Sequence, residues 1–305
     1  MDLSTRVGAV SLPNPVLTAS GTSGHGAELS AYFDLSTLGA VVVKSLSASP
    51  WPGNPAPRVH ETAAGMLNSV GLQGPGVEGW MERDLPALVA TGARVVASIW
   101  GTSVDGYGKA AAMLADAPPA VVAVEVNLSC PNVEERRSVF AHSASATADA
   151  VSAALTCGRP LWAKLSPNVT DLASIASAAL GAGASALTLI NTVMGMAIDP
   201  VTRRPVLGAG GGGLSGPAIH PVAVRAVHEC RAAFPEAPII GVGGVATGAD
   251  AVELLVAGAS AVQVGTATFA DPRAPVRVLD ELREWCRRHN VTRLADLIGA
   301  SHDPG

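Results

Sequence analysis

The feature that most constrains the fold of this chain is a regular alternation of two kinds of segment. Short runs rich in Val, Ile, Leu and Ala are followed by longer, Ala-rich stretches whose apolar residues have helical spacing. This order is typical of βαβ units, in which a helix connects two parallel strands. The pattern predicts eight strands, at Pro15–Ala19, Ala40–Lys44, Arg94–Ile99, Val121–Asn127, Leu161–Leu165, Ala186–Ile190, Pro238–Val242 and Ala261–Val264. It predicts helices near Val77–Ala90, Val104–Ala117, Ala144–Thr156, Asp171–Ala182, Pro217–Ala233, Gly248–Ala257 and Pro272–Arg288.

Eight such units fit a single domain. The chain has 305 residues, and a (β/α)8 barrel needs about 250 before insertions. No break in composition and no Pro- or Ser-rich linker divides the sequence. We therefore expect an α/β protein whose residues 1–305 form one (β/α)8 TIM barrel, with the tail after about residue 290 at its periphery. A doubly wound parallel sheet is the alternative. The insertions Ser45–Gly76 and Asn191–Gly216 are longer than ordinary βα loops and are expected over the C-terminal face.

Composition excludes several classes of protein. Hydrophobic residues make up 48% of the chain and charged residues 15%, so disorder is excluded. The net charge of −5 and the lack of a basic stripe argue against a nucleic-acid partner. The stretch between Asp171 and Asp199 carries no charge, but Gly and polar residues interrupt it, and it is interpreted as helix, turn and strand rather than a membrane span. No secretory signal is evident at the N-terminus, and we expect a soluble cytoplasmic protein.

Cysteines and histidines give no sign of a metal site. The four cysteines lie far apart and form no C-x-x-C pair: Cys130, Cys157, Cys230 and Cys286. They suit neither a disulfide framework nor a zinc or iron–sulfur site within this chain. The seven histidines show no ligand spacing. No metal is expected.

Polar residues gather where the predicted strands end. Barrel enzymes carry their chemistry at the C-terminal ends of strands. Two lysines, Lys44 and Lys164, stand at such ends, and an ammonium group inside an apolar barrel needs an anion or an electron-rich ring beside it. Asn127 and Asn191 follow two further strands. Together these residues predict a binding site for an anionic or electron-rich ligand.

Glycine-rich turns point to a phosphate. Gly243-Gly244 and Gly265-Thr266 follow the seventh and eighth predicted strands, where barrels commonly hold a phosphate with backbone N–H groups. A barrel with that site often carries flavin mononucleotide (FMN). The run Gly208-x-Gly210-x-x-Gly213 matches a dinucleotide fingerprint, but it follows no convincing strand and is interpreted as a flexible loop beside the cofactor.

Longer motifs resemble a known family. They include Asn14-Pro-Val-Leu-Thr-Ala-Ser-Gly21, Gly65-Met-Leu-Asn-Ser-Val-Gly-Leu-Gln73, Glu125-Val-Asn-Leu-Ser-Cys-Pro-Asn132, Ala163-Lys-Leu-Ser-Pro-Asn168 and Ile190-Asn-Thr-Val-Met-Gly195. In this order they resemble the class 1 dihydroorotate dehydrogenases, flavin enzymes of pyrimidine synthesis, from about Leu3 to Arg288. The Ser-Cys-Pro-Asn element is highly specific. Cysteine rather than serine at position 130 resembles class 1.

The resemblance implies a reaction and a set of site residues. Dihydroorotate loses a proton from C5 and a hydride from C6, the hydride passes to FMN, and orotate is formed. Cys130 is expected to be the general base. Substrate binding is implied for Lys44, Asn68, Ser69, Val70, Gly71, Leu72, Asn127, Asn132, Asn191 and Thr192. FMN binding is implied for Ser20, Lys44, Ser45, Ser98, Asn127, Lys164, Ile190, Gly216, Gly243, Gly244, Gly265 and Thr266.

The resemblance extends to partners. The Gly65–Asn68 and Lys164–Asn168 elements resemble class 1B, whose FMN barrel pairs with a subunit carrying FAD and a [2Fe–2S] cluster and passes electrons to NAD. A homodimer of barrels is then expected at the core of a heterotetramer. Fumarate, the acceptor of class 1A, is the alternative.

The sequence also departs from the family. Gly74 and Ser98 stand where asparagine is common, and Val133–His142 replaces the usual glycine-bearing lid. Two other functions therefore stay open. One is a flavin barrel that acts on another pyrimidine, as dihydropyrimidine dehydrogenases do. The other is a non-catalytic flavin subunit for electron transfer.

Overall fold

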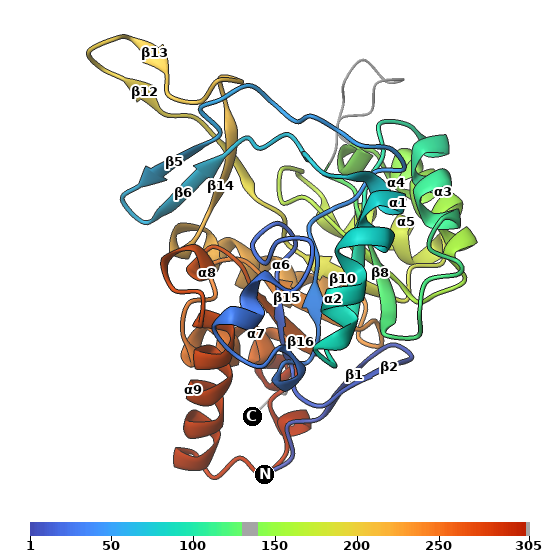
Figure 1. Cartoon of the computed structure of the whole chain (residues 1–305). Helices are drawn as coiled ribbons and strands as arrows, with labels where there is room; N and C mark the ends of the chain where they lie inside the picture. The colour runs from blue at the N-terminus through green and yellow to red at the C-terminus, as the bar shows by residue number, and fades with distance from the viewer. Residues whose placement is uncertain (130–139, 303–305) are drawn as a thin grey trace.

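Eight parallel strands close into a barrel (Figure 1). The computed structural model describes residues 1–129 and 140–302. The barrel strands are β3 (Val16–Thr18), β4 (Val41–Val42), β7 (Val95–Ile99), β8 (Val121–Asn127), β9 (Leu161–Lys164), β10 (Ala186–Leu189), β15 (Ile239–Val242) and β16 (Ala261–Val264). Backbone bonds from Gly39 N to Val16 O (2.8 Å) and from Thr18 N to Ala40 O (3.3 Å) join the first strand to the second. This closure confirms the predicted TIM barrel and excludes the doubly wound sheet.

Helices follow the strands as the sequence predicts. They are α1 (Gly76–Arg83), α2 (Leu85–Ala90), α3 (Val104–Ala112), α4 (Ala144–Ala154), α5 (Leu172–Gly181), α6 (His220–Ala233), α7 (Gly248–Ala257), α8 (Ala267–Ala270) and α9 (Ala274–Arg288). Short 3-10 turns are η1 (Glu28–Ala31), η2 (Leu35–Thr37), η3 (Phe140–His142), η4 (Leu155–Cys157), η5 (Pro217–Ile219), η6 (Leu294–Asp296) and η7 (Ala300–His302). The helix expected over Val77–Ala90 is divided at Asp84, because Pro86 fits only in the first turn of a new helix. The four-residue α8 was not predicted.

The strands bury both faces. One large apolar cluster lies between the barrel and its helices, and a second fills the barrel interior. Because side chains alternate along a strand, Ala123, Glu125 and Asn127 of β8 share the inner face and rise toward the C-terminal end. Trp162 and Lys164 do the same on β9. The interior therefore changes from apolar to polar as it approaches the C-terminal face.

A hairpin closes the opposite end of the barrel. It consists of β1 (Thr5–Val7) and β2 (Val10–Leu12) and lies near the N-terminus in Figure 1. Its side chains Val7, Val10 and Leu12 are buried in the same cluster as Leu17 and Trp162 of the barrel strands. Ligands therefore have to enter the barrel from the other face.

The two long insertions form a sheet together. β5 (Val59–Thr62) and β6 (Gly65–Asn68) come from the first insertion, and β11 (Val193–Gly195) and β14 (Gly212–Ser215) from the second; they pair in the antiparallel order β11-β14-β6-β5. A further hairpin, β12 (Ile198–Asp199) and β13 (Arg204–Pro205), extends beyond the barrel (Figure 1).

The expectation of a flexible loop over Gly208–Gly213 is wrong for Gly212 and Gly213, which lie in β14. A Cβ atom on Gly213 would lie 2.0 Å from Oγ1 of Thr192, so this glycine lets β14 lie close to the residue that precedes β11.

The remaining sequence expectations concern the cysteines, the tail and membranes. Cys157, Cys230 and Cys286 are free and buried, and burial raises the pKa of Cys230 to about 12. After residue 290, Leu294 is fully buried, and the backbone at Arg293 forms a parallel β-bridge with the backbone at Asp2 near the N-terminus. Within residues 1–129 and 140–302, no helix is both long and apolar enough to cross a bilayer, and no group of three or more metal-ligating side chains gathers.

Candidate active site

The strand ends meet in a continuous chain of hydroxyl and amide groups. The Ser45 Oγ atom lies 3.1 Å from Ser20 Oγ and 2.8 Å from Ser98 Oγ. Asn127 Nδ2 donates to Ser45 Oγ (3.1 Å), and Asn191 Nδ2 donates to Asn127 Oδ1 (3.1 Å). These five residues come from five different strand ends, as the sequence predicted. Their hydrogen bonds fix the side-chain amides at the mouth of the barrel.

Lys164 projects into the barrel from the end of β9 and has a counter-ion. Its Nζ atom lies 3.4 Å from Oε1 of Glu125 and 3.4 Å from Oε1 of Gln263. Gln263 Nε2 donates to the other oxygen of Glu125 (2.7 Å), and both side chains are fully buried. The anion that a buried lysine requires is thus partly supplied by the protein. Both contacts of Lys164 are long, so its ammonium keeps donor capacity for a ligand above it.

Lys44 lies two residues beyond β4, which is shorter than the predicted strand Ala40–Lys44, and it borders a cavity of about 620 Å³. The cavity is lined by His25, Lys44, Pro50, Trp51, Pro52, Gln73, Gly74 and Pro75. Burial, and secondly the nearby Arg58, lower the pKa of Lys44. The Nε2 atom of the partly exposed His25 is buried and unbonded among the described residues, and burial followed by the Lys44 charge lowers the pKa of this histidine. This wall can therefore attract an anion.

The segment Asn68–Leu72 is held in place by Asn54, which belongs to the same insertion. Asn54 Nδ2 donates to Ser69 Oγ (2.8 Å), and Asn54 N donates to the carbonyl of Val70 (3.1 Å). Gly71 and Leu72 both have positive φ angles, of 71° and 60°. Asn68 Nδ2 donates to the carbonyl of Gly213 (3.4 Å), within the antiparallel sheet.

Thr192 directly precedes β11, the edge strand of this sheet opposite β5. Its backbone N–H donates to Asn191 Oδ1 (2.8 Å), and its carbonyl accepts from Asn168 Nδ2 (3.0 Å). The two predicted substrate segments, Asn68–Leu72 and Asn191–Thr192, are thus joined through strands β6 and β14.

Backbone amides gather after β15 and β16. In the part of the chain that the structure describes, the N–H groups of Gly244, Gly265 and Thr266 donate to no protein acceptor. A Cβ atom at Gly244 would lie 2.6 Å from His220 Cβ, and one at Gly216 would lie 2.7 Å from Gly65 Cα. Thr266 Oγ1 donates to Ser215 Oγ (2.7 Å), and Ile190 is buried beside Gly243. Free amides at closely packed glycines are what a phosphate monoester requires, so these residues fit the terminal group of FMN.

Two predicted site residues lie outside the described part of the chain. They are Cys130 and Asn132, and most of the segment Val133–His142 lies there too. Ser129, the last described residue before them, donates its backbone N–H to Asn127 Oδ1 (3.2 Å).

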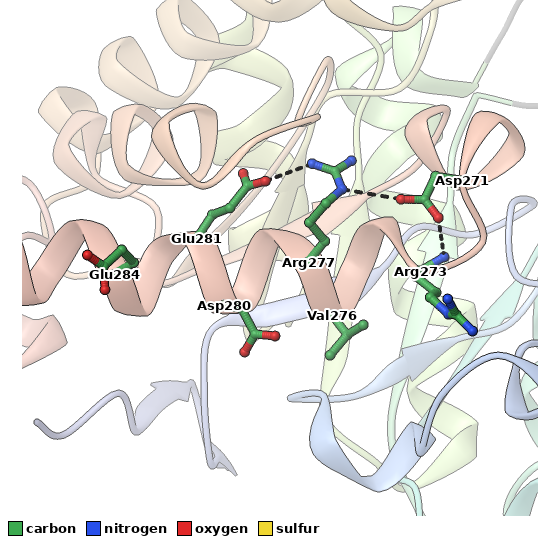
Figure 2. Close-up of a pocket in the computed structure, with 7 residues that line it drawn as sticks. All are labelled: Asp271, Arg273, Val276, Arg277, Asp280, Glu281 and Glu284. Atoms are coloured by element: carbon green, nitrogen blue, oxygen red, sulfur yellow. Dashed lines mark hydrogen bonds and ion pairs between the residues drawn. The ribbon is translucent and has the colours of Figure 1, made fainter.

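A second depression, of about 540 Å³, lies along the outer surface of α9 (Figure 2). Arg277 points between Asp271 and Glu281 there, at 3.2 and 2.9 Å. These three charges pair with one another at the surface.

The sequence analysis missed four contributors to the site. Glu125 and Gln263 contact Lys164 inside the barrel, Asn54 holds the segment Asn68–Leu72, and His220 contacts Gly243. Glu125 and Gln263 could have been found, because a charged or amide side chain on the inner face of a buried strand needs a partner. Asn54 and His220 act through loop contacts that no local pattern reveals.

The family model and three curated relatives that match this chain all carry the name dihydroorotate dehydrogenase. Residues 2–285 match the model of the dihydroorotate dehydrogenase family. The chain is 46% identical over 300 residues to the "dihydroorotate dehydrogenase B (NAD(+)), catalytic subunit" of Geobacter sp. (strain M21), covering 98% of both chains. It is 48% identical over 300 residues to the protein of the same name from Desulforudis audaxviator, covering 98% of this chain and 97% of the relative. It is also 47% identical over 298 residues to a "putative dihydroorotate dehydrogenase A (fumarate)" of Solibacter usitatus, covering 97% of each.

Proposed function

The chain belongs to the dihydroorotate dehydrogenase family, and from this membership we propose how its residues carry out the reaction. The protein is an oxidoreductase of pyrimidine biosynthesis that acts on the CH–CH group of dihydroorotate, with FMN as cofactor. One observation supports the assignment of the site: Lys164, the Ser20–Asn191 network and the unbonded glycine amides all converge on one end of the barrel.

FMN is held along the strand ends. The amides of Gly243, Gly244, Gly265 and Thr266 receive the phosphate, and Gly216 and Ile190 line the path toward the ring. The ring system would be held by Ser20, Ser45, Ser98, Lys44 and Asn127, four of which are joined by hydrogen bonds at the strand ends, and Lys164 would lie at its polar edge. When bound, FMN accepts the hydride that leaves C6 of dihydroorotate. Lys164, whose charge Glu125 only partly balances, favours negative charge on that edge.

Dihydroorotate is a carboxylate with a ring of amide groups. Lys44 pairs with the carboxylate, and the amides of Asn68, Asn127, Asn132 and Asn191 match the donors and acceptors of the ring edges. The backbone of Ser69–Leu72 and the hydroxyl of Thr192 complete the contacts. The hydrogen bond between Asn191 and Asn127 supports this arrangement, because it fixes the orientation of both amides at the mouth of the barrel.

Cys130 is proposed as the general base that removes the proton from C5. The support is its place in the Ser-Cys-Pro-Asn motif, three residues after β8 ends at Asn127. A thiol with an ordinary pKa of about 8.5 is mostly protonated at neutral pH. Turnover should therefore rise toward alkaline pH.

We further propose that the chain is a catalytic subunit. The names of the Geobacter and Desulforudis relatives support this view, since both include the words "catalytic subunit" and NAD(+). A homodimer of barrels would then associate with an electron-transfer subunit carrying FAD and a [2Fe–2S] cluster. The Solibacter relative, whose name includes fumarate, keeps direct transfer to fumarate as the alternative.

One anaerobic titration tests the function. The purified yellow protein is mixed with dihydroorotate, and loss of the flavin absorbance is recorded. We expect stoichiometric bleaching by dihydroorotate and none by dihydrouracil. Bleaching by dihydrouracil alone would assign the protein to another pyrimidine, and no bleaching by either would assign it to electron transfer without catalysis.

A further inference from the structure

His220, the first residue of α6, connects helix α7 with the loop that follows β15. Its Nδ1 atom lies 2.8 Å from the carbonyl oxygen of Gly243, and its Nε2 atom lies 3.1 Å from Oε2 of Glu253 on α7. Asp250, also on α7, lies 4.0 Å from Nε2. The side chain of His220 is only 11% exposed. The ring therefore lies between α7 and the loop that follows β15.

The partners determine which groups donate. A carbonyl oxygen has no proton to give, so Nδ1 must carry the hydrogen of the bond to Gly243. On the other side of the ring, Nε2 faces the carboxylate of Glu253 at 3.1 Å. Asp250 cannot move away easily, because it accepts the backbone N–H groups of Ala246 and Thr247 at the start of α7. The His220 ring thus contacts α7 on one side and donates to the Gly243 carbonyl on the other.

The bond to Gly243 fixes a complete peptide group. The Gly243–Gly244 peptide is not among the cis bonds of the chain, so the Gly243 carbonyl and the Gly244 N–H point in opposite directions. With the carbonyl turned toward His220, the Gly244 N–H must point away from His220. That N–H donates to no protein acceptor in the described part of the chain.

The two glycines do not by themselves select one orientation of this peptide. Gly243 and Gly244 have φ angles of 138° and 71°, which glycine adopts readily and other residues rarely do. Two consecutive glycines leave the plane between them free to rotate, so an acceptor or donor outside the loop has to select one orientation. His220 provides that donor.

We infer that His220 is a positioning residue of the phosphate site: it holds the Gly243–Gly244 peptide with its N–H directed at the phosphate of FMN. The inference rests on the proposed placement of the phosphate at these glycines. It assigns to α6 and α7 a role in cofactor affinity, although neither Glu253 nor His220 touches the cofactor. In the proposed placement the peptide that His220 orients meets the phosphate rather than the ring, so the effect should be specific to the phosphate.

The test compares FMN with riboflavin, which has the same ring and no phosphate. Dissociation constants of both flavins are measured with the flavin-free protein by fluorescence. His220→Phe keeps a ring of similar size but cannot donate to Gly243. We expect it to weaken FMN binding about 10- to 100-fold, the effect of one hydrogen bond to a charged group. Riboflavin binding should stay unchanged within about twofold.

Two variants control the comparison. His220→Asn keeps a side-chain N–H that can reach the Gly243 carbonyl, and it should recover most of the FMN affinity. His228→Phe alters an exposed histidine of the same helix, stacked on His302, and should change neither constant. If His220→Phe does not fold, His220→Ala makes the same test.

Equal loss of both flavins in His220→Phe would show a general structural role and overturn the inference, as would unchanged FMN binding. If the wild-type protein binds FMN no better than riboflavin, the proposed phosphate placement fails before His220 is considered.

Discussion

Lys164 and Glu125 face each other inside the barrel, with 3.4 Å between Nζ and Oε1, and Glu125 has no exposed surface. Removal of one partner leaves a charge buried without its counter-ion. We expect Lys164→Met to lower the free energy of unfolding by about 3–5 kcal/mol. In Lys164→Met combined with Glu125→Leu, no uncompensated charge remains, so much of the loss should be recovered. Urea unfolding of the single and double variants measures these free energies. An equal loss of unfolding free energy in both would contradict the pairing.

The proposed base can be tested without disturbing the cofactor. Cys130→Ala should retain FMN, since the proposed phosphate and ring contacts come from other strands. Its rate of dihydroorotate oxidation with a dye acceptor should fall by roughly 10² to 10⁴, the usual contribution of a general base. Cys130→Ser should be intermediate to poor, because a hydroxyl is the weaker base. Cys286→Ala alters a buried cysteine of α9 and is the matched control. A wild-type rate in Cys130→Ala would show that the base is another group.

Lys44 should make ligand binding depend on pH. Burial, with Arg58 second, lowers the pKa of this lysine, so its ammonium loses the proton at a lower pH than the ordinary value of about 10.4. Only the charged form pairs with a carboxylate. Orotate affinity should therefore decline as the pH rises through this lowered pKa. Lys44→Met should bind orotate about tenfold or more weakly at pH 7.

The slope of orotate affinity against pH distinguishes Lys44 from other groups that titrate in the same pH range. Lys44→Met should lose the part of the alkaline decline that Lys44 contributes, whereas Lys109→Met, at an exposed lysine of α3 paired with Asp105, should retain it. Identical slopes in the wild type and Lys44→Met would assign the decline elsewhere.

The acceptor is tested with the isolated chain. We expect it to oxidise dihydroorotate with an artificial dye but to reduce NAD slowly, and to gain NAD activity when the electron-transfer subunit is added. Steady-state assays with NAD and fumarate decide this. Rapid turnover with fumarate would assign the protein to class 1A, and rapid NAD reduction by the chain alone would refute the need for a partner.

The sequence predicts the barrel well because each βα unit carries its own pattern. β8 and β16 have the predicted bounds, Val121–Asn127 and Ala261–Val264, since alternation and β-branched runs are local. The strand-end residues Ser45, Asn127 and Asn191 are brought together as expected, because parallel strands all end on one face. The roles of these residues remain predictions.

What the sequence did not predict depends on distant contacts. The pairing of Asn68 with Gly213 joins segments 145 residues apart, and glycines in β14 suggest flexibility when read alone. The same holds for His220, whose partners Gly243 and Glu253 lie in a later loop and helix. Such contacts follow from tertiary packing, which no local periodicity encodes.

The sheet β11-β14-β6-β5 has a consequence for engineering this enzyme. Its central pair, β6 and β14, comes from two insertions, so each insertion supplies the hydrogen-bond partners of the other. If only one were grafted onto another barrel, a row of backbone N–H and C=O groups would lose its partners and become an open strand edge, prone to aggregation. A chimera that seeks a new substrate preference should therefore exchange residues 45–76 and 191–216 as one unit, and libraries that diversify them should vary the facing positions together.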